Sequence, residues 1–250
     1  MNARRAAVAR TSPKPGGGGE SGPPLALASD QRGLALIAVL LWTALVTALA
    51  SALVLVTTVE TTISARHRDG LDALYAADAA LEIAVGQLAA VTNFDLVLNG
   101  TSRSTSSDGA PTGTRRAADG TSIDLDKLTA MLRCGKESAC SDADMSSVTA
   151  DRPWGISNPR WQLFLSGSLG SIAGLPDGTA RAYVLVWVGD DPSDSDGDPL
   201  RDSSEVDNPG RGRILVTAQA YGASGARRTI QATIARVGGA IRMITWREVI

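Results

Sequence analysis

The longest apolar stretch of the chain begins at Leu34, directly after Gly33, and continues without a charged residue to Val59. As an α-helix, residues 34–59 span about 39 Å at 1.5 Å per residue. That length exceeds the hydrocarbon core of a membrane, which is about 30 Å thick. A cleaved secretion signal has an apolar region of only about 7–15 residues. The stretch therefore predicts a transmembrane helix, and a plain single-pass anchor is the simplest reading.

Hydroxyl residues interrupt this apolar stretch but do not break the predicted helix. Each can donate its hydroxyl to a backbone carbonyl three or four residues earlier, which satisfies the polar group inside the helix. They are Thr43, Thr47, Ser51, Thr57 and Thr58.

The apolar pattern changes after Val59 but stays helical. Residues 60–92 contain no proline, and large apolar side chains recur at spacings built from three and four, which predicts one stripe along an amphipathic helix. The stripe consists of Ile63, Leu71, Leu74, Leu81, Val85 and Leu88. Alanines fill much of the remainder. We therefore expect one continuous helix, with a membrane half at 34–59 and an amphipathic half at 60–92.

The last part of the chain, residues 160–250, alternates as strands do. In residues 181–188, for example, Val184, Val186 and Val188 share one face of a strand, whereas Leu185 and Trp187 share the other. Further strands are predicted at 160–167, 213–221, 226–236 and 240–249. The expected fold class is α+β, with the Ile63–Leu88 stripe packed on one face of a mostly antiparallel sheet.

The region between helix and sheet, residues 93–159, is predicted to be rich in loops. Residues 99–122 are dominated by Ser, Thr and Gly, which is typical of an exposed loop. A short helix is expected at 123–133, where apolar residues form one edge.

Charge is distributed unevenly along the chain. Residues 1–33 carry five basic and two acidic side chains, and the rest carries 19 basic and 24 acidic ones. A basic segment before a membrane helix favours a cytoplasmic N-terminus and an exported C-terminal head. Net charge and aromatic content give no indication of nucleic-acid binding.

A leader that ends in glycine, followed at once by a hydrophobic helix with an amphipathic second half, resembles the type IV pilins and pseudopilins. "RGLALIAVLL" (32–41) together with "YAADAALEIAVGQL" (75–88) most resembles PilX-type minor pilins. "RGLALIAVLLW" alone also resembles the K-type minor pseudopilins of type II secretion.

The resemblance implies a processing site and partners. A prepilin peptidase would cut between Gly33 and Leu34, remove the leader 1–33 and leave a methylated N-terminus. The subunit would reside in the bacterial inner membrane with its head in the periplasm. From there it would join other pilin or pseudopilin subunits by helix packing, for which the alanine-rich face is the expected surface.

The resemblance also contains a departure at Ala38, the fifth residue after the predicted cut. Major pilins carry a glutamate there, which is thought to neutralise the N-terminal amine of a neighbouring subunit. A subunit at the tip of a filament has no neighbour above it that needs such a partner. Ala38 therefore favours a minor pilin that primes or caps assembly, unless the chain is a membrane anchor unrelated to pili.

Cys134 and Cys140 have five residues between them in a predicted loop. If this region is exported, a local disulfide is favoured. A zinc site is the alternative, but two cysteines without a nearby histidine cannot supply four ligands.

Residues 189–207 form an acidic segment with eight carboxylates and a single arginine. "DSDGD" resembles part of an oxygen-ligand calcium loop, in which alternate carboxylates point inward. The candidate calcium ligands are Asp191, Asp194, Asp196, Asp198 and Asp202. The alternative is a solvated acidic loop that keeps the edge of the sheet soluble.

Enzymatic function is not predicted. The single histidine, His67, lies between Arg66 and Arg68 on the predicted helix, and no nucleophile, phosphate or zinc-protease motif is present. No catalytic residue and no cofactor other than calcium is expected. A calcium-dependent binding or adhesion head on the membrane anchor is the alternative of a different class.

Overall fold

The computed structural model describes residues 31–176 and 178–249. The chain divides into two compact units, one ending at Thr57 and the other beginning at Thr58. The predicted leader falls largely outside the described residues. Helix α1 (Gln31–Ala89) runs without interruption from the first unit into the second, as the sequence predicts.

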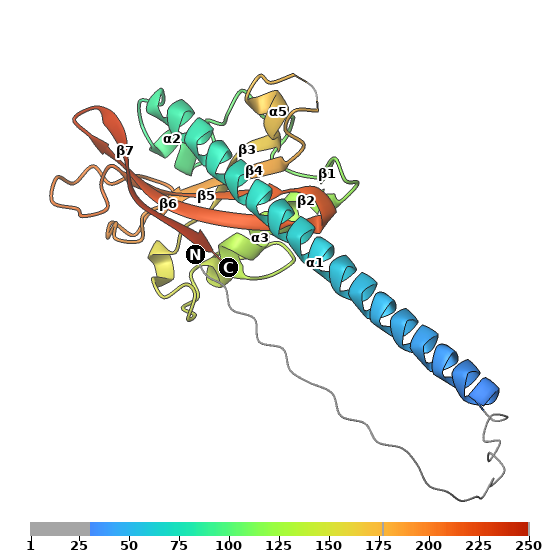
Figure 1. Cartoon of the computed structure of the whole chain (residues 1–250). Helices are drawn as coiled ribbons and strands as arrows, with labels where there is room; N and C mark the ends of the chain where they lie inside the picture. The colour runs from blue at the N-terminus through green and yellow to red at the C-terminus, as the bar shows by residue number, and fades with distance from the viewer. Residues whose placement is uncertain (1–30, 177, 250) are drawn as a thin grey trace, which may run out of the picture. The chain divides into compact units, whose positions relative to one another are not determined.

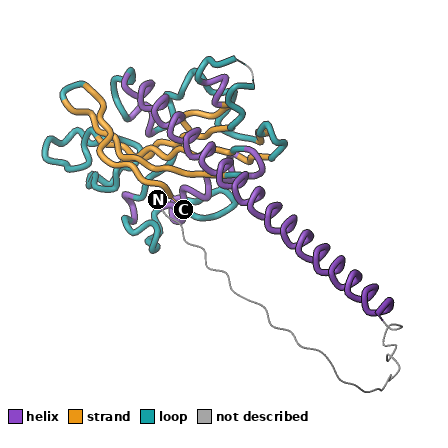
Figure 2. Tube along the Cα trace, viewed as in Figure 1, coloured by secondary structure: helices purple, strands orange, loops and turns teal. Residues whose placement is uncertain are grey.

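The second unit contains the predicted antiparallel sheet, which five strands form in chain order. They are β3 (Gln162–Ser168), β4 (Tyr183–Asp190), β5 (Arg213–Tyr221), β6 (Arg227–Val237) and β7 (Ala240–Val249). The α+β, pilin-like fold predicted from the sequence is confirmed. Figure 1 shows the C-terminal part of α1 crossing one face of this sheet, and Figure 2 shows the strands as a single layer.

The alternation along β4 places its side chains in two different cores. Val184, Val186 and Val188 lie in the core between sheet and helix. Leu185 and Trp187 lie in a second core on the opposite face, where the Trp187 indole nitrogen donates to the Thr129 hydroxyl at 3.0 Å. The sheet is therefore covered by α1 on one side and partly by the 114–134 region on the other.

The region 93–159, predicted to be rich in loops, contains several short elements. These are α2 (Asp95–Leu98), β1 (Thr114–Arg116), β2 (Ser122–Asp124), α3 (Leu125–Cys134), α4 (Asp142–Met145) and a 3₁₀ turn (Gly155–Ser157). The short helix predicted at 123–133 is α3. A further short helix, α5 (Leu169–Ile172), follows β3, and a 3₁₀ turn (Ala223–Gly225) joins β5 to β6.

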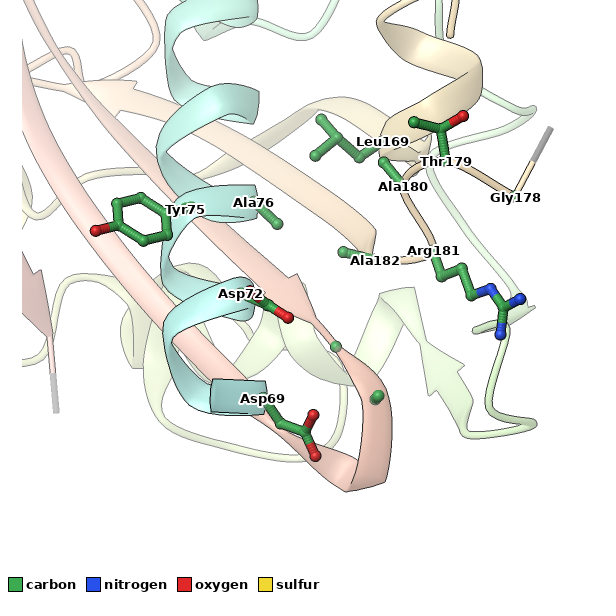
Figure 3. Close-up of a pocket in the computed structure, with 12 residues that line it drawn as sticks. Asp69, Asp72, Tyr75, Ala76, Leu169, Gly178, Thr179, Ala180, Arg181 and Ala182 are labelled. Carbon is green, nitrogen blue, oxygen red and sulfur yellow. The ribbon is translucent and has the colours of Figure 1, made fainter. Parts of the chain in front are cut away.

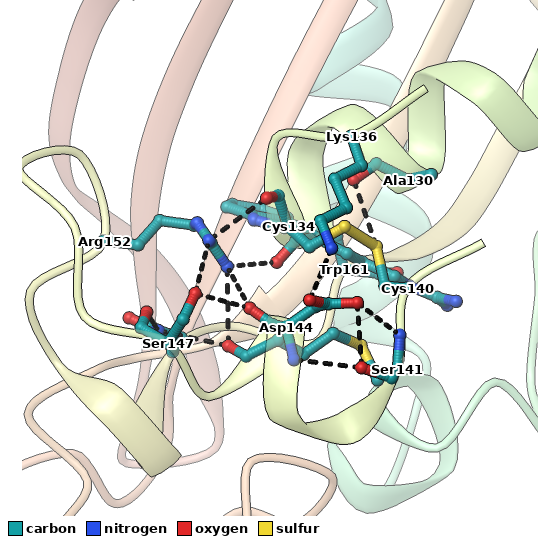
Figure 4. The surroundings of a disulfide bond; sticks show 12 residues. Ala130, Cys134, Lys136, Cys140, Ser141, Asp144, Ser147, Arg152 and Trp161 are labelled. Carbon is teal, nitrogen blue, oxygen red and sulfur yellow. Dashed lines mark hydrogen bonds and ion pairs between the residues drawn. A yellow bond between two sulfur atoms is a disulfide. The ribbon is translucent and has the colours of Figure 1, made fainter. Parts of the chain in front are cut away.

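A disulfide and several hydrogen bonds hold the region after α3 in place (Figure 4). Cys134 and Cys140 form a disulfide, with their Cα atoms 6.1 Å apart. The Arg152 guanidinium donates to the carbonyls of Arg133, at 2.7 Å, and Cys134, at 3.1 Å. These bonds satisfy carbonyls at the C-terminal end of α3, which have no partner inside the helix.

The face of α1 that packs on the sheet agrees only in part with the predicted stripe. Leu81 and Leu88 are fully buried, and Leu74 and Val85 are partly buried against the same core. Ile63 is 62% exposed and Leu71 is 38% exposed. Most of the buried face consists of alanines instead. The alanine face, as we name it, comprises Ala73, Ala76, Ala77, Ala80 and Ala84.

Two physical reasons account for this correction. The described residues begin to cover α1 only from about Gly70 onward, where a Cβ would lie 3.0 Å from the Arg228 guanidinium, and Ile63 lies before this point and is exposed. Where the sheet does cover the helix, alanine side chains make up most of the helix side of the core. The alanine face is therefore used inside the head, and the expectation that it packs against other subunits is wrong for these residues.

Overpacking this face should destabilise the head. We expect Ala77→Leu to lower the free energy of unfolding by about 1–3 kcal/mol, because Ala77 is fully buried and extra methyl groups force the helix away from the strands. Urea denaturation followed by tryptophan fluorescence measures this. The matched control is Ala89→Leu at the exposed end of α1, where a change within about 0.5 kcal/mol is expected. Equal effects of the two substitutions would contradict the packing described.

Candidate functional site

The N-terminal part of α1 is apolar and exposed along its whole length. Every side chain from Gly33 to Thr57 is exposed, including Leu34 at 73% and Trp42 at 68%. The helix is long and apolar enough to cross a membrane, with a mean hydropathy of 2.4 in its most apolar window. Such a surface is stable in lipid and unfavourable in water.

Backbone bonds satisfy the hydroxyl groups in this segment, as predicted. Thr43 donates to the Leu40 carbonyl at 3.0 Å, Ser51 to the Thr47 carbonyl at 2.8 Å, and Thr57 to the Leu53 carbonyl at 3.1 Å. Thr47 donates to the carbonyls of Thr43 and Ala44. Because polar groups in hydrocarbon need internal partners, these bonds make the segment compatible with a membrane.

Gly33 lies inside the first turns of α1, where glycine has no structural role. A Cβ at position 33 would meet no atom within 4 Å. Glycine in a helix interior is about 1 kcal/mol less favourable than alanine. Neither packing nor backbone conformation in the described part of the chain therefore explains the glycine before Leu34.

The acidic loop between β4 and β5 is organised around one buried carboxylate. Asp194 is 2% exposed, and its Oδ1 accepts from the Asn208 amide at 2.5 Å. Its Oδ2 accepts from the backbone N–H of Ser203 at 2.9 Å. A Cβ on Gly210 would overlap the backbone of Asp194, so the loop needs glycine there for close approach. Asp194 therefore holds the two arms of the loop together.

The other candidate calcium ligands mostly bond to their own loop. Asp191, Asp196 and Asp198 each accept from the backbone N–H two residues later, at 2.8–2.9 Å for the first two and 3.2 Å for the third. Asp202 accepts from the Gly212 N–H at 2.6 Å. Over residues 31–176 and 178–249, no three His, Cys, Asp or Glu side chains gather as a metal-binding group. The structure thus does not bring the five aspartates together, and calcium binding stays a prediction.

Asp190, at the end of β4, is the acidic residue that sequence reasoning did not single out as a site. Its side chain is 3% exposed, and its Oδ1 has no hydrogen-bond partner in the structure. Burial, and next the negative charge of Asp194, raise the pKa of this carboxyl to about 8. The alternation of the strand could have indicated that Asp190 is buried, because Asp190 continues the buried series of Val184, Val186 and Val188.

A shallow pocket of about 650 Å³ lies where α1 meets the segment before β4. Asp69, Asp72 and Ala76 line it from the helix, and Leu169 and Ala182 line it from the other side. Figure 3 shows Asp69, Asp72 and Ala76 on α1, with Leu169 and Ala182 across from them. The sequence did not indicate this pocket, and its lining suggests no specific chemistry.

Asp190 should make the head less stable as the pH rises. A carboxyl with a raised pKa in the folded state contributes stability that is complete below its unfolded pKa, near 4, and is lost as the pH rises through about 8. We expect the free energy of unfolding to fall from about pH 5 to about pH 8, and Asp190→Asn to flatten that fall. Denaturation across this range measures it, with Asp151→Asn, at an exposed loop position, as control. Parallel pH profiles for wild type and Asp190→Asn would contradict the assignment.

Comparison with known proteins adds one finding. Residues 32–82 match the family model described as PilX N-terminal. No curated protein and no solved structure matches the chain. The match covers the apolar half of α1 and most of its packed half, and the α+β fold that follows is pilin-like. On this match and this fold, the chain carries the N-terminal segment of a PilX-type type IV pilin.

Proposed function

We propose that the chain is a minor pilin that primes or caps assembly of a type IV pilus. The match to the N-terminal segment of PilX-type pilins implies contact with other pilus subunits. The observation that carries the further step is Ala38, which lies in an apolar stretch without any carboxylate from Leu34 to Val59. A buried carboxylate in lipid costs about 2.5–3.5 kcal/mol on insertion scales unless it finds a partner.

In the family pattern, that partner is the N-terminal amine of a neighbouring subunit. A bulk subunit has such a neighbour, so a carboxylate at this position becomes paired on assembly. A subunit placed first in the filament has no neighbouring subunit on one side, and so no amine to pair with there. The uncharged Ala38 suits that place, because it leaves no unpaired charge in the membrane or at the tip.

The proposal includes processing at Gly33. Among the described residues, nothing gives the glycine a packing or conformational role, so recognition by a membrane peptidase that cuts before Leu34 supplies a reason for it. The new N-terminus would lie at the start of the apolar surface. The leader, residues 1–33, would stay on the cytoplasmic side because of its excess of basic residues.

The disulfide in the head agrees with export of the head from the cytoplasm. The Cys134–Cys140 disulfide is stable in oxidising compartments such as the periplasm and is rare in the cytosol. Export would leave α1 as the anchor in the inner membrane before assembly.

Processing can be tested by intact mass. We expect protein isolated from membranes to begin at Leu34 and to carry one methyl group on its amine. Gly33→Val should keep residues 1–33, because a side chain at this position blocks cleavage. Gly86→Val is the matched control, since a Cβ at Gly86 also meets no atom within 4 Å. A wild-type chain that retains residues 1–33 would rule the pilin pathway out.

Priming can be tested by counting filaments. Cells without this protein should make few or no pili, of ordinary length, because initiation and not elongation is lost. Ala38→Glu should restore fewer pili than Ala38→Gln, because its charge has no amine to pair with. Normal pilus numbers in the deletion, together with loss of type II secretion, would instead support the K-type pseudopilin alternative.

A further inference from the structure

The two edges of the sheet differ in how their backbone groups are satisfied. At the β3 edge, the chain's own residues 103–108 bond to the strand. Ser104 N–H donates to the Phe164 carbonyl at 3.0 Å, and Asp108 N–H donates to the Ser166 carbonyl at 2.9 Å. At the other edge, β7 pairs with β6, and no further strand among the described residues lies beyond it.

The hydrogen-bond phase shows which groups of β7 face outward. Arg236 on β6 donates its N–H to the Gly212 carbonyl at 2.8 Å, toward β5. Its partner across the β6–β7 ladder, Ile241, is therefore in a pair that exchanges no backbone bonds, and its N–H and C=O point away from β6. Two residues on, Met243 repeats this orientation. The backbone groups of Ile241 and Met243 are thus directed to the open side of the sheet.

The side chains of β7 define two faces for an incoming strand. On the helix face, Ile241 and Met243 pack on the core, and the Trp246 indole donates to Asp78 of α1 at 3.1 Å. On the opposite face stand Arg242 and Arg247. Trp246 is 46% exposed and Ile244 is 54% exposed, which leaves an apolar strip beside the unpaired backbone.

The β6–β7 hairpin is also a basic part of an acidic protein. Residues 226–249 contain five arginines and one acidic residue, Glu248, whereas the whole chain has a net charge of −2. Glu248 pairs with Arg228 at 3.1 Å. Arg247 bonds to the neutral Gln231 at 3.2 Å through its Nε, so its charge is not neutralised there.

We propose that the open edge of β7 binds an extended segment of a partner protein as a sixth strand, and that acidic and apolar side chains alternate in this segment. Backbone hydrogen bonds between β7 and the segment supply the affinity. The side chains on the two faces of β7 select for alternating acidic and apolar residues in the segment. Acidic side chains face Arg242 and Arg247, while apolar ones lie beside Ile241, Met243 and Trp246. Tryptophan and arginine are the residue types most often found at the centre of protein interfaces. The proposal does not depend on the priming role.

The test uses full-length protein in detergent and a nine-residue peptide of alternating valine and glutamate with blocked ends. Amide hydrogen exchange is followed residue by residue. In the free protein, the amides of Ile241 and Met243 should exchange fast and that of Arg242, which bonds to β6, slowly. The peptide should slow the first two by about tenfold or more at saturation and leave Arg242 nearly unchanged.

Two altered peptides separate backbone pairing from charge. The same peptide N-methylated at every residue has no backbone N–H to donate at either edge and should not protect Ile241 or Met243. A valine–lysine peptide should bind at least about tenfold more weakly than the glutamate peptide. Arg242→Glu with Arg247→Glu should reverse that preference. The matched control, Arg116→Glu with Arg181→Glu at exposed positions elsewhere, should not.

Several results would overturn the proposal. If the N-methylated peptide bound as tightly as the unmethylated one, binding would rest on charge attraction and not on strand pairing. If the lysine peptide bound as tightly as the glutamate peptide, the partner segment would not need acidic side chains. Slow exchange of Ile241 and Met243 in the free protein would mean that this edge is already covered. Protection that grows with protein concentration, without peptide, would identify a second copy as the occupant.

Discussion

Packing of the alanine face of α1 on the sheet forms the main core of the head. Ala77, Ala80 and Ala84 share this core with valines and isoleucines of β4, β5 and β6. The contact also sets the position of the C-terminal end of α1. There, Arg236 of β6 donates to the Val91 carbonyl and lies over the Phe94 ring at 4.7 Å, and Asp95 accepts from the Asp202 N–H at 2.8 Å. The helix, the hairpin and the acidic loop are thereby joined at one end of the sheet.

One helix has two different surroundings. Its first part exposes leucines and valines on all sides and satisfies its hydroxyls internally, which suits lipid. Its second part buries small residues on strands and leaves Tyr75 and Glu82 exposed. Subunit contacts made by this second part of α1 must therefore use its outer side, because the alanine face is already occupied.

Charge is separated between two neighbouring hairpin connections. In the acidic loop after β4, Asp190 and Asp194 are buried, whereas the other acidic side chains are partly or fully exposed. The β6–β7 hairpin presents its arginines outward. A partner with acidic side chains would be repelled by the acidic loop and attracted by the β6–β7 hairpin. Charge therefore favours binding of such a partner at the hairpin.

The sequence by itself determined the long helix and the strands of the main sheet, but not the short elements between them other than α3. Period and length specified a helix beginning near Leu34, and alternation specified four or five strands and the two faces of β4, because both signals depend on local backbone geometry. Tertiary structure decided which side of α1 is buried, since that depends on where the sheet lies along and around the helix and not on side-chain size alone. It also decided that Asp191, Asp196 and Asp198 bond to their own backbone instead of converging. Whether β7 stays an open edge likewise followed only from strand order and from the phase of its hydrogen bonds.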